Sequence, residues 1–353
     1  MTKKLLILFF VFIFLGFKFI SQTTPYKFDV IDYFPKMPMS TVNPVTNEGA
    51  ALGRLLFYDS ILSVDYSMSC ATCHKQKFAF TDQQQFSKGV NEVMLKRNTM
   101  PLFNLAWYPS FFWDGKANSI ENQVFFPVSA HNEMNLNWKT AEKRINKSKL
   151  YRSLFIKAFG LKPIDSLLIS YAIAQFERSL ISNHSKFDNV LNGQEYLSAD
   201  EYEGYGLIND QTKGDCLHCH LTDGNGLGTN QKFSNNGLDN IKNINNYKDN
   251  GLGKISGNQS DIGLFKVPSL RNLSFTAPYM HDGRFKSLKE VLNFYSEGVN
   301  NSINVDSKMS FAHKGGAHLT NSEKDKIIKF LLTLNDSVFV TNPKFSNPFI
   351  LSR

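Results

Sequence analysis

The 353-residue chain has few cysteines, four in all, and it has no low-complexity or collagen-like tract. Hydrophobic residues make up 42% and charged residues 20% of the chain, which excludes a disordered tail and a small disulfide scaffold. The formal net charge is +8, but no five or six Lys and Arg residues follow one another, so we expect no nucleic-acid partner. Motifs for nucleotide, nicotinamide or flavin binding are missing as well. What remains is a globular chain long enough for two ordinary cores.

Long apolar runs are also missing, except at the N-terminus. Two lysines precede 13 apolar residues, Leu5 to Phe17. This run is short for a bilayer-spanning helix, which needs about 20 apolar residues, and the pattern is typical of an export signal. Residues 1–21 therefore predict a signal peptide or an N-terminal anchor and a protein of the periplasm. Cysteines normally pair as disulfides in that compartment.

The four cysteines form two copies of a C-x-x-C-H motif instead. The two motifs contain Cys70, Cys73 and His74, and Cys216, Cys219 and His220. This motif attaches c-type haem: two thiols form thioethers to the porphyrin, and the adjoining histidine binds the iron. A thioredoxin-like pair would need a βαβ context, and a zinc site would not normally split its thiols into distant halves that both end in histidine. The sequence predicts two covalent haems.

The rest of the chain predicts helices separated by loops. A helix is expected over residues 166–182, where apolar residues recur at Leu168, Ala172, Phe176 and Leu180. Capping boxes at residues 287–290 and 320–323 predict two further helix starts, and the last helix is expected to end near Leu334. The Gly/Asn-rich stretch 222–258 predicts a long irregular loop.

The predicted fold class is all-α, with two cytochrome-c-like helical domains that each hold one covalent haem. The first domain is expected at residues 22–200 and the second at residues 201–353, including the C-terminal tail after Asp336. The tail could fold back on either domain.

Seven blocks of sequence in and around the haem motifs resemble the bacterial dihaem cytochrome c peroxidase/MauG family. They are residues 52–59, 69–74, 78–82, 97–99, 112–115, 266–272 and 278–283. They occur in the family's order, and the match spans about residues 50–335. The resemblance implies an N-terminal haem where peroxide reacts and a C-terminal haem that takes in electrons.

The resemblance also implies roles for individual residues. Gln123 and Glu133 fall ten and twenty residues after Trp113, at the positions of the family's distal glutamine and catalytic glutamate. Such a carboxylate can move a proton between the peroxide oxygens. Taken alone, Glu133 would be a surface acid. Trp113 matches the family's electron relay between the haems, and it could equally be a packed core indole.

The family resemblance also implies roles for residues between the two domains. Asn98, Thr276 and Pro278 match the family's calcium site, for which the alternative is an ordinary polar loop. His281 is expected to contact a haem propionate or the domain junction, or to be a structural residue.

Two positions depart from the classical peroxidases of the family. Val90 stands seven residues before Arg97, where those enzymes carry a histidine that caps the peroxidatic iron. Valine cannot bind iron, so we expect an open or water-bound N-terminal haem. Tyr295 stands fourteen residues after His281, in place of the methionine that binds the C-terminal iron, as in the MauG branch. Met280, and less so Met309, compete with Tyr295 for this role.

The resulting functional hypothesis is an exported dihaem peroxidase that reduces hydrogen peroxide to water. Its expected partners are peroxide and a small electron-donor protein, such as a cytochrome c or a cupredoxin. One alternative is a MauG-like oxidase that uses peroxide to oxidise a protein or organic partner. The other is a plain dihaem electron carrier. A carrier would have no use for the Gln123 and Glu133 pair.

Overall fold

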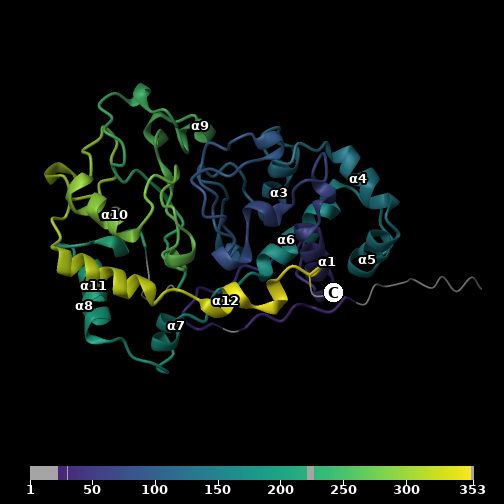
Figure 1. Ribbon diagram of the computed structural model, residues 1–353, viewed down its shortest axis with the longest axis horizontal. Helices are drawn as coiled ribbons and strands as arrows, with labels where there is room; N and C mark the ends of the chain where they lie inside the picture. Colours follow the sequence, from purple (N-terminus) through teal and green to yellow (C-terminus); the bar gives the residue numbers. More distant parts are fainter. Residues whose placement is uncertain (1–22, 30, 221–225, 351–353) are drawn as a thin grey trace, which may run out of the picture.

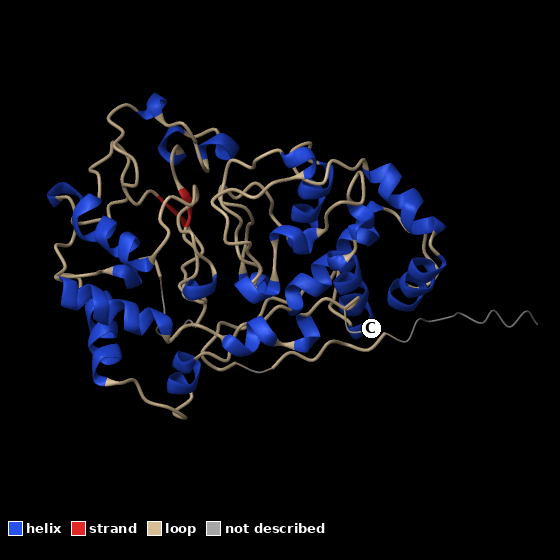
Figure 2. Ribbon diagram, in the orientation of Figure 1, coloured by secondary structure: helices blue, strands red, loops and turns tan. Residues whose placement is uncertain are grey.

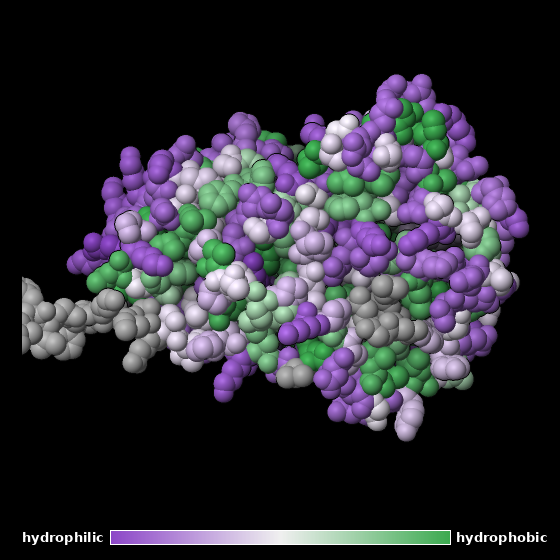
Figure 3. Space-filling model, turned by 180° about the vertical axis from the view of Figure 1, so that it is seen from behind, coloured by the Kyte–Doolittle hydropathy of each residue, from purple (hydrophilic) through white to green (hydrophobic). Residues whose placement is uncertain are grey.

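The computed structural model describes residues 23–29, 31–220 and 226–350, and the leader or anchor predicted within residues 1–21 lies outside this part. The described chain is helical with little strand (Figures 1 and 2), as predicted. No helix within the described ranges is long and apolar enough to cross a membrane. Figure 3 shows one face of the molecule, over which hydrophilic side chains are spread with small hydrophobic areas between them.

The helices and strands are short and are joined by long loops. They are α1 Asn47–Tyr58, α2 Cys70–Cys73, α3 Ile120–Ser129, α4 Trp138–Lys147, α5 Lys149–Phe159, α6 Ser166–Ser179, α7 Lys186–Leu191, α8 Ala199–Asn209, α9 Gly253–Ser256, α10 Leu288–Asn293, α11 Asn321–Leu332, α12 Ser337–Thr341, β1 Phe233–Ser234 and β2 Phe265–Lys266. The two strands pair antiparallel. Elsewhere, the predicted loop at residues 222–258 is mostly irregular where it is described.

The N-terminal half has its core where α1 crosses α6. The crossing is close because Gly53 has no side chain: a Cβ there would lie 1.9 Å from the carbonyl oxygen of Ala172. Apolar residues lie around most of α6, including Ile169 and Ile173, which are fully buried. The helix predicted at residues 166–182 is present over Ser166–Ser179, three residues shorter than expected, and it is buried almost all round rather than along one stripe.

The C-terminal half packs α8 and α10 against α11. The Thr320–Glu323 capping box is present: the Glu323 amide donates to the Thr320 hydroxyl (3.2 Å), and the Thr320 amide donates to the Glu323 carboxylate (2.7 Å). At the start of α10 only half of the predicted box forms. Ser287 caps the Glu290 amide, but the Glu290 carboxylate accepts from the amide of Lys286 (2.6 Å).

The C-terminal tail returns to the N-terminal half. The further helix α12 follows α11, so the expectation that the last helix ends near Leu334 was wrong. Phe339 and Phe345 join a core cluster of the N-terminal half. Tyr58 of α1 donates to the carbonyl of Phe345 (2.7 Å), and Figure 1 shows the tail running back beneath that half. The domain limits at residues 200 and 201 stay a prediction.

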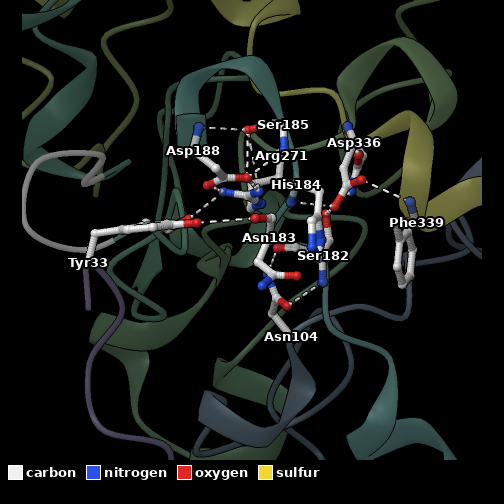
Figure 4. Close-up of polar contacts among 12 residues, drawn as sticks. Tyr33, Asn104, Ser182, Asn183, His184, Ser185, Asp188, Arg271, Asp336 and Phe339 are labelled. Carbon is white, nitrogen blue, oxygen red and sulfur yellow. Dashed lines mark hydrogen bonds and ion pairs between the residues drawn. The ribbon is translucent and has the colours of Figure 1, made fainter. Parts of the chain in front are cut away.

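A buried polar network joins the two halves (Figure 4). Arg271 is 1% exposed and makes a bidentate ion pair with Asp188, with one bond of 2.9 Å. Before Asp188 in the same segment, Ser182 exchanges hydrogen bonds with Asn104 and donates to the carboxylate of Asp336 (3.0 Å). The segment connecting the halves is therefore tied to the C-terminal half and to the returning tail at once.

Candidate haem sites

Both C-x-x-C-H histidines present one ring nitrogen for a ligand. His74 Nδ1 bonds to the carbonyl of Phe80 (2.8 Å), and His220 Nδ1 bonds to the carbonyl of Pro268 (3.0 Å). These bonds fix Nδ1 as the protonated nitrogen and leave the Nε2 lone pair free. Burial lowers the pKa of His74, and it lowers the pKa of His220 to about 4, so both rings are neutral near pH 7. Neutral imidazole is the form that binds iron.

The four cysteines form no disulfides, and each pair precedes one of these histidines in its motif. The α2 turn Cys70–Cys73 carries the first pair, and the His74 amide closes the turn by donating to the carbonyl of Cys70 (2.9 Å). Burial raises the pKa of Cys73 to about 11 and that of Cys216 to about 12. Unpaired thiols next to a ligand-ready imidazole fit a covalently attached haem in each half.

A cavity of about 1140 Å³ lies beside His74. The residues predicted for the peroxidatic site that line it are His74, Trp113, Gln123 and Glu133. Helix α3 supplies Gln123, and the turn after α3 supplies Glu133. Residues 247–250 of the C-terminal half also line the cavity, so both halves form its wall.

Glu133 is fixed by its backbone against the loop that contains Val90. The Val90 amide donates to the carbonyl of Glu133 (2.9 Å). The contact requires Gly89, because a Cβ there would lie 2.1 Å from the carbonyl oxygen of Asn132. Burial raises the pKa of Glu133, and the nearby Lys116 lowers it in part. The side chain of Val90 is 2% exposed and packs in the core with Cys73.

Trp113 lies between the two halves. Its indole Nε1 donates to the carbonyl of Asn98 (2.8 Å), and its own carbonyl accepts from the amide of Lys266 on β2 (2.9 Å). The Asn98 amide in turn donates to the carbonyl of His281 (2.8 Å). The His281 ring stacks on the Phe265 ring, with the two ring centroids 3.6 Å apart. Trp113 and His281 are thus linked through one backbone segment at the junction.

The three candidate ligands for the second iron lie in one cluster. Tyr295 is on a π-helical turn, Phe294–Gly298, that follows α10, and it packs with Met280 and Met309. Asn236 Nδ2 donates to the Tyr295 hydroxyl (3.0 Å) and contacts the Met280 sulfur (3.6 Å). Burial raises the pKa of Tyr295 to about 12, and the hydrogen bond from Asn236 offsets part of this shift.

Of the residues predicted to bind calcium, Asn98 contacts the carbonyl of His281, which follows Thr276 and Pro278 in the same loop. The Asn98 carboxamide nitrogen donates to the carbonyls of Gln84 (2.9 Å) and Gln85 (3.3 Å). This orientation leaves the carboxamide oxygen as the potential ligand atom, and amide and carbonyl oxygens fit a hard cation. Within the described ranges, no three His, Cys, Asp or Glu side chains gather as a metal-binding group.

Lys266, Arg97 and Glu177 are among the charged residues of the cavity wall to which the sequence assigned no role. Lys266 is 2% exposed, and burial lowers its pKa to about 8. Arg97 joins the halves by binding Asp114 (2.6 Å) and Asp249 (2.8 Å). Glu177 is 5% exposed, and burial raises its pKa to about 8. A signal for Glu177 was present in the sequence, since a charge inside a helix that is apolar all round must be buried.

The helical fold and its two histidine and cysteine sites define a cytochrome-like protein with two haem sites. A family model described as di-haem cytochrome c peroxidase matches residues 47–196. The methylamine utilization protein MauG of Methylophilus methylotrophus is 33% identical over 303 residues, 85% of this chain and 86% of its own. The cytochrome c551 peroxidase of Nitrosomonas europaea is 32% identical over 321 residues, 90% and 87% of the two chains.

A solved structure agrees with these relatives. The crystal structure of a MauG-like protein associated with microbial copper homeostasis superposes with a TM-score of 0.83 at 30% identity, covering 92% of this chain and 99% of the other. The chain therefore belongs to the dihaem cytochrome c peroxidase/MauG family. It is an oxidoreductase of the cytochrome-c peroxidase type, which acts on hydrogen peroxide.

Proposed function

We propose that this protein is an exported dihaem peroxidase that reduces hydrogen peroxide to water in the cavity beside His74. The observation that supports this proposal most is that His74, Gln123 and Glu133 line one cavity. A plain electron carrier needs no carboxyl group beside an open iron face. When bound, the haems supply the two electrons that each peroxide consumes.

The residues that would hold the haems follow from the two motifs. The thiols of Cys70 and Cys73 anchor the first porphyrin, and those of Cys216 and Cys219 anchor the second. His74 and His220 would bind the irons through Nε2, because carbonyl groups occupy their Nδ1 atoms.

Glu133 manages the protons of the reaction. Its carboxylate accepts the proton of one peroxide oxygen and returns it to the other oxygen as the O–O bond breaks. The raised pKa of Glu133 supports this role. A carboxylate with a higher pKa is a stronger base, so it accepts the proton more readily and can still return it. Gln123 orients the peroxide through its amide without competing for the proton.

The two departures from classical peroxidases shape how the site works. Val90 offers no ligand atom, so a haem held by His74 would be open to peroxide without prior reduction. Tyr295 would hold the iron at His220 opposite the histidine once the haem is bound. The Asn236 hydrogen bond to its hydroxyl supports this role, because it lowers the cost of forming the phenolate. An Fe–S bond in the resonance Raman spectrum would favour Met280 instead.

Electrons pass between the halves by way of Trp113 and come from a small donor protein, a cytochrome c or a cupredoxin. The buried indole at the junction supports this route. We place the protein in the periplasm, with its leader in residues 1–21. Calcium at Asn98, Thr276 and Pro278 would brace the same junction.

A second candidate function is a MauG-like oxidase that uses peroxide to oxidise a protein or organic partner. Val90 and Tyr295 favour it, and two relatives carry the name MauG. The test is to mix holoprotein with peroxide, follow the Soret band, and then measure peroxide turnover with reduced cytochrome c or a reduced cupredoxin. Donor oxidation that matches peroxide consumption supports the peroxidase. A Soret change with no donor oxidation favours the oxidase, and no Soret change favours the plain carrier.

A further inference from the structure

A buried carboxyl group without an ion-pair partner in the described part of the chain lines the cavity beside His74. Glu177 lies in the last turn of α6, is 5% exposed, and lines the same cavity as Glu133. The role proposed for Glu133 leaves Glu177 unused. A carboxyl group sealed in a protein interior normally needs a cation or a proton to remain there.

The neighbouring cation does not neutralise Glu177. Arg178 turns to Glu121 on α3 and binds both of its carboxylate oxygens, at 2.5 Å and 2.8 Å. Glu121 also accepts from Asn43 (2.8 Å), so this pair is complete without Glu177. Within the described ranges, Glu177 forms no ion pair.

The surroundings of Glu177 favour its neutral form. It lies at the carboxyl end of α6, where the helix dipole disfavours a negative charge. Burial raises its pKa to about 8, Glu121 adds a smaller repulsion, and Arg178 offsets part of the shift. A group that holds its proton only marginally near neutral pH responds strongly to any change of charge close by.

The shared cavity connects Glu177 with the proposed haem. His74 and Glu177 both line it. A haem held at His74 would therefore place the charge of its iron in the same poorly screened interior as Glu177.

We propose that Glu177 takes up a proton when the neighbouring haem iron gains an electron. The electron removes one unit of positive charge from the iron, and the Glu177 carboxylate then binds one proton from solvent to become the neutral acid. The electron comes from the donor protein or, in the experiment, from an electrode. This inference rests on the proposed haem at His74. In this role Glu177 stores a proton near the haem, whereas Glu133 transfers protons to and from the peroxide.

The test is a spectroelectrochemical titration of the holoprotein between about pH 6 and about pH 9. The two haem midpoints are assigned by electron paramagnetic resonance of partly reduced samples. Glu177 has one pKa when the neighbouring iron is oxidised and a higher one when it is reduced. Between these two pKa values, one proton accompanies each electron, and the midpoint potential falls by about 59 mV for each tenfold drop in proton concentration. We expect this slope for the haem at His74 in the wild type and in Glu133→Gln, and its loss in Glu177→Gln. An unchanged slope in Glu177→Gln, or its loss in Glu133→Gln, would overturn the proposal.

Two controls separate the ways in which this test could fail. Haem content, counted from the pyridine complexes of wild-type protein, tests the haem placement independently of Glu177. If Glu177→Gln does not fold, infrared difference spectra of wild-type protein replace it. Reduction should then produce a carbonyl band of a protonated carboxyl that shifts in D₂O, and the absence of this band contradicts the proposal.

Discussion

Replacing Glu133 by glutamine removes the proton acceptor and leaves the cavity otherwise intact. Glutamine has nearly the same volume, and the bond from the Val90 amide to the carbonyl of residue 133 does not involve the side chain. Gln123 cannot accept the proton in place of Glu133. Positioned acid–base groups contribute about 10² to 10⁴ in rate, so the reaction with peroxide should slow by that factor, about 3 to 5 kcal/mol of barrier.

The pH profile provides a second readout of the same variant. Because burial raises the pKa of Glu133, the wild-type rate should fall with decreasing pH from a point above the ordinary glutamate pKa of about 4.3. Glu133→Gln should lack this acid limb. The assay is stopped-flow mixing of ferric holoprotein with peroxide at a series of pH values.

Glu92→Gln is the matched control for this experiment. Glu92 lies on the same loop as Val90, has a side chain that is 78% exposed, and pairs with Lys88 (2.5 Å). Its substitution removes the same charge outside the cavity and should leave the peroxide rate unchanged. A full rate in Glu133→Gln, or an equal loss in both variants, would refute the role given to Glu133.

Three further predictions concern other parts of the molecule. Gly89→Ala should push back the backbone of Glu133, destabilise the fold by about 1–3 kcal/mol and slow the peroxide reaction, as calorimetry and stopped-flow will test. Asp188→Asn should cost about 3–5 kcal/mol in urea unfolding near pH 7, because it leaves Arg271 buried without its partner. Arg271 lowers the pKa of Asp188 in the folded protein, so this difference should shrink as pH falls through that pKa; a constant difference would contradict the pairing. Tyr295→Phe should raise the midpoint of the haem at His220, since an anionic oxygen stabilises ferric iron, whereas an unchanged midpoint would favour Met280 as ligand.

The sequence predicts features that depend on local chemistry. The capping box at Thr320, the apolar helix that begins at Ser166 and the two C-x-x-C-H motifs are each contained within a few residues. The structure brings Gln123 and Glu133 into one cavity with His74, although only the family resemblance had related them.

The features that sequence reasoning missed depend on contacts between distant segments. The tail could not be assigned to a half because Phe345 meets Tyr58 across 287 residues. The ion pair of Arg97 with Asp249 spans 152 residues and involves a loop without periodicity. The π-helical turn that carries Tyr295 follows a normal α-helical pattern, and nothing in the spacing marks the change.

The central claim is that the iron at His74 accepts peroxide directly because Val90 stands where a ligand would be. Electron paramagnetic resonance of the resting ferric holoprotein tests this most directly, because it reports the ligands of both irons in one spectrum. We predict a high-spin signal from the haem at His74 and a low-spin signal from the six-coordinate haem at His220. A spectrum with only low-spin haem would contradict this account.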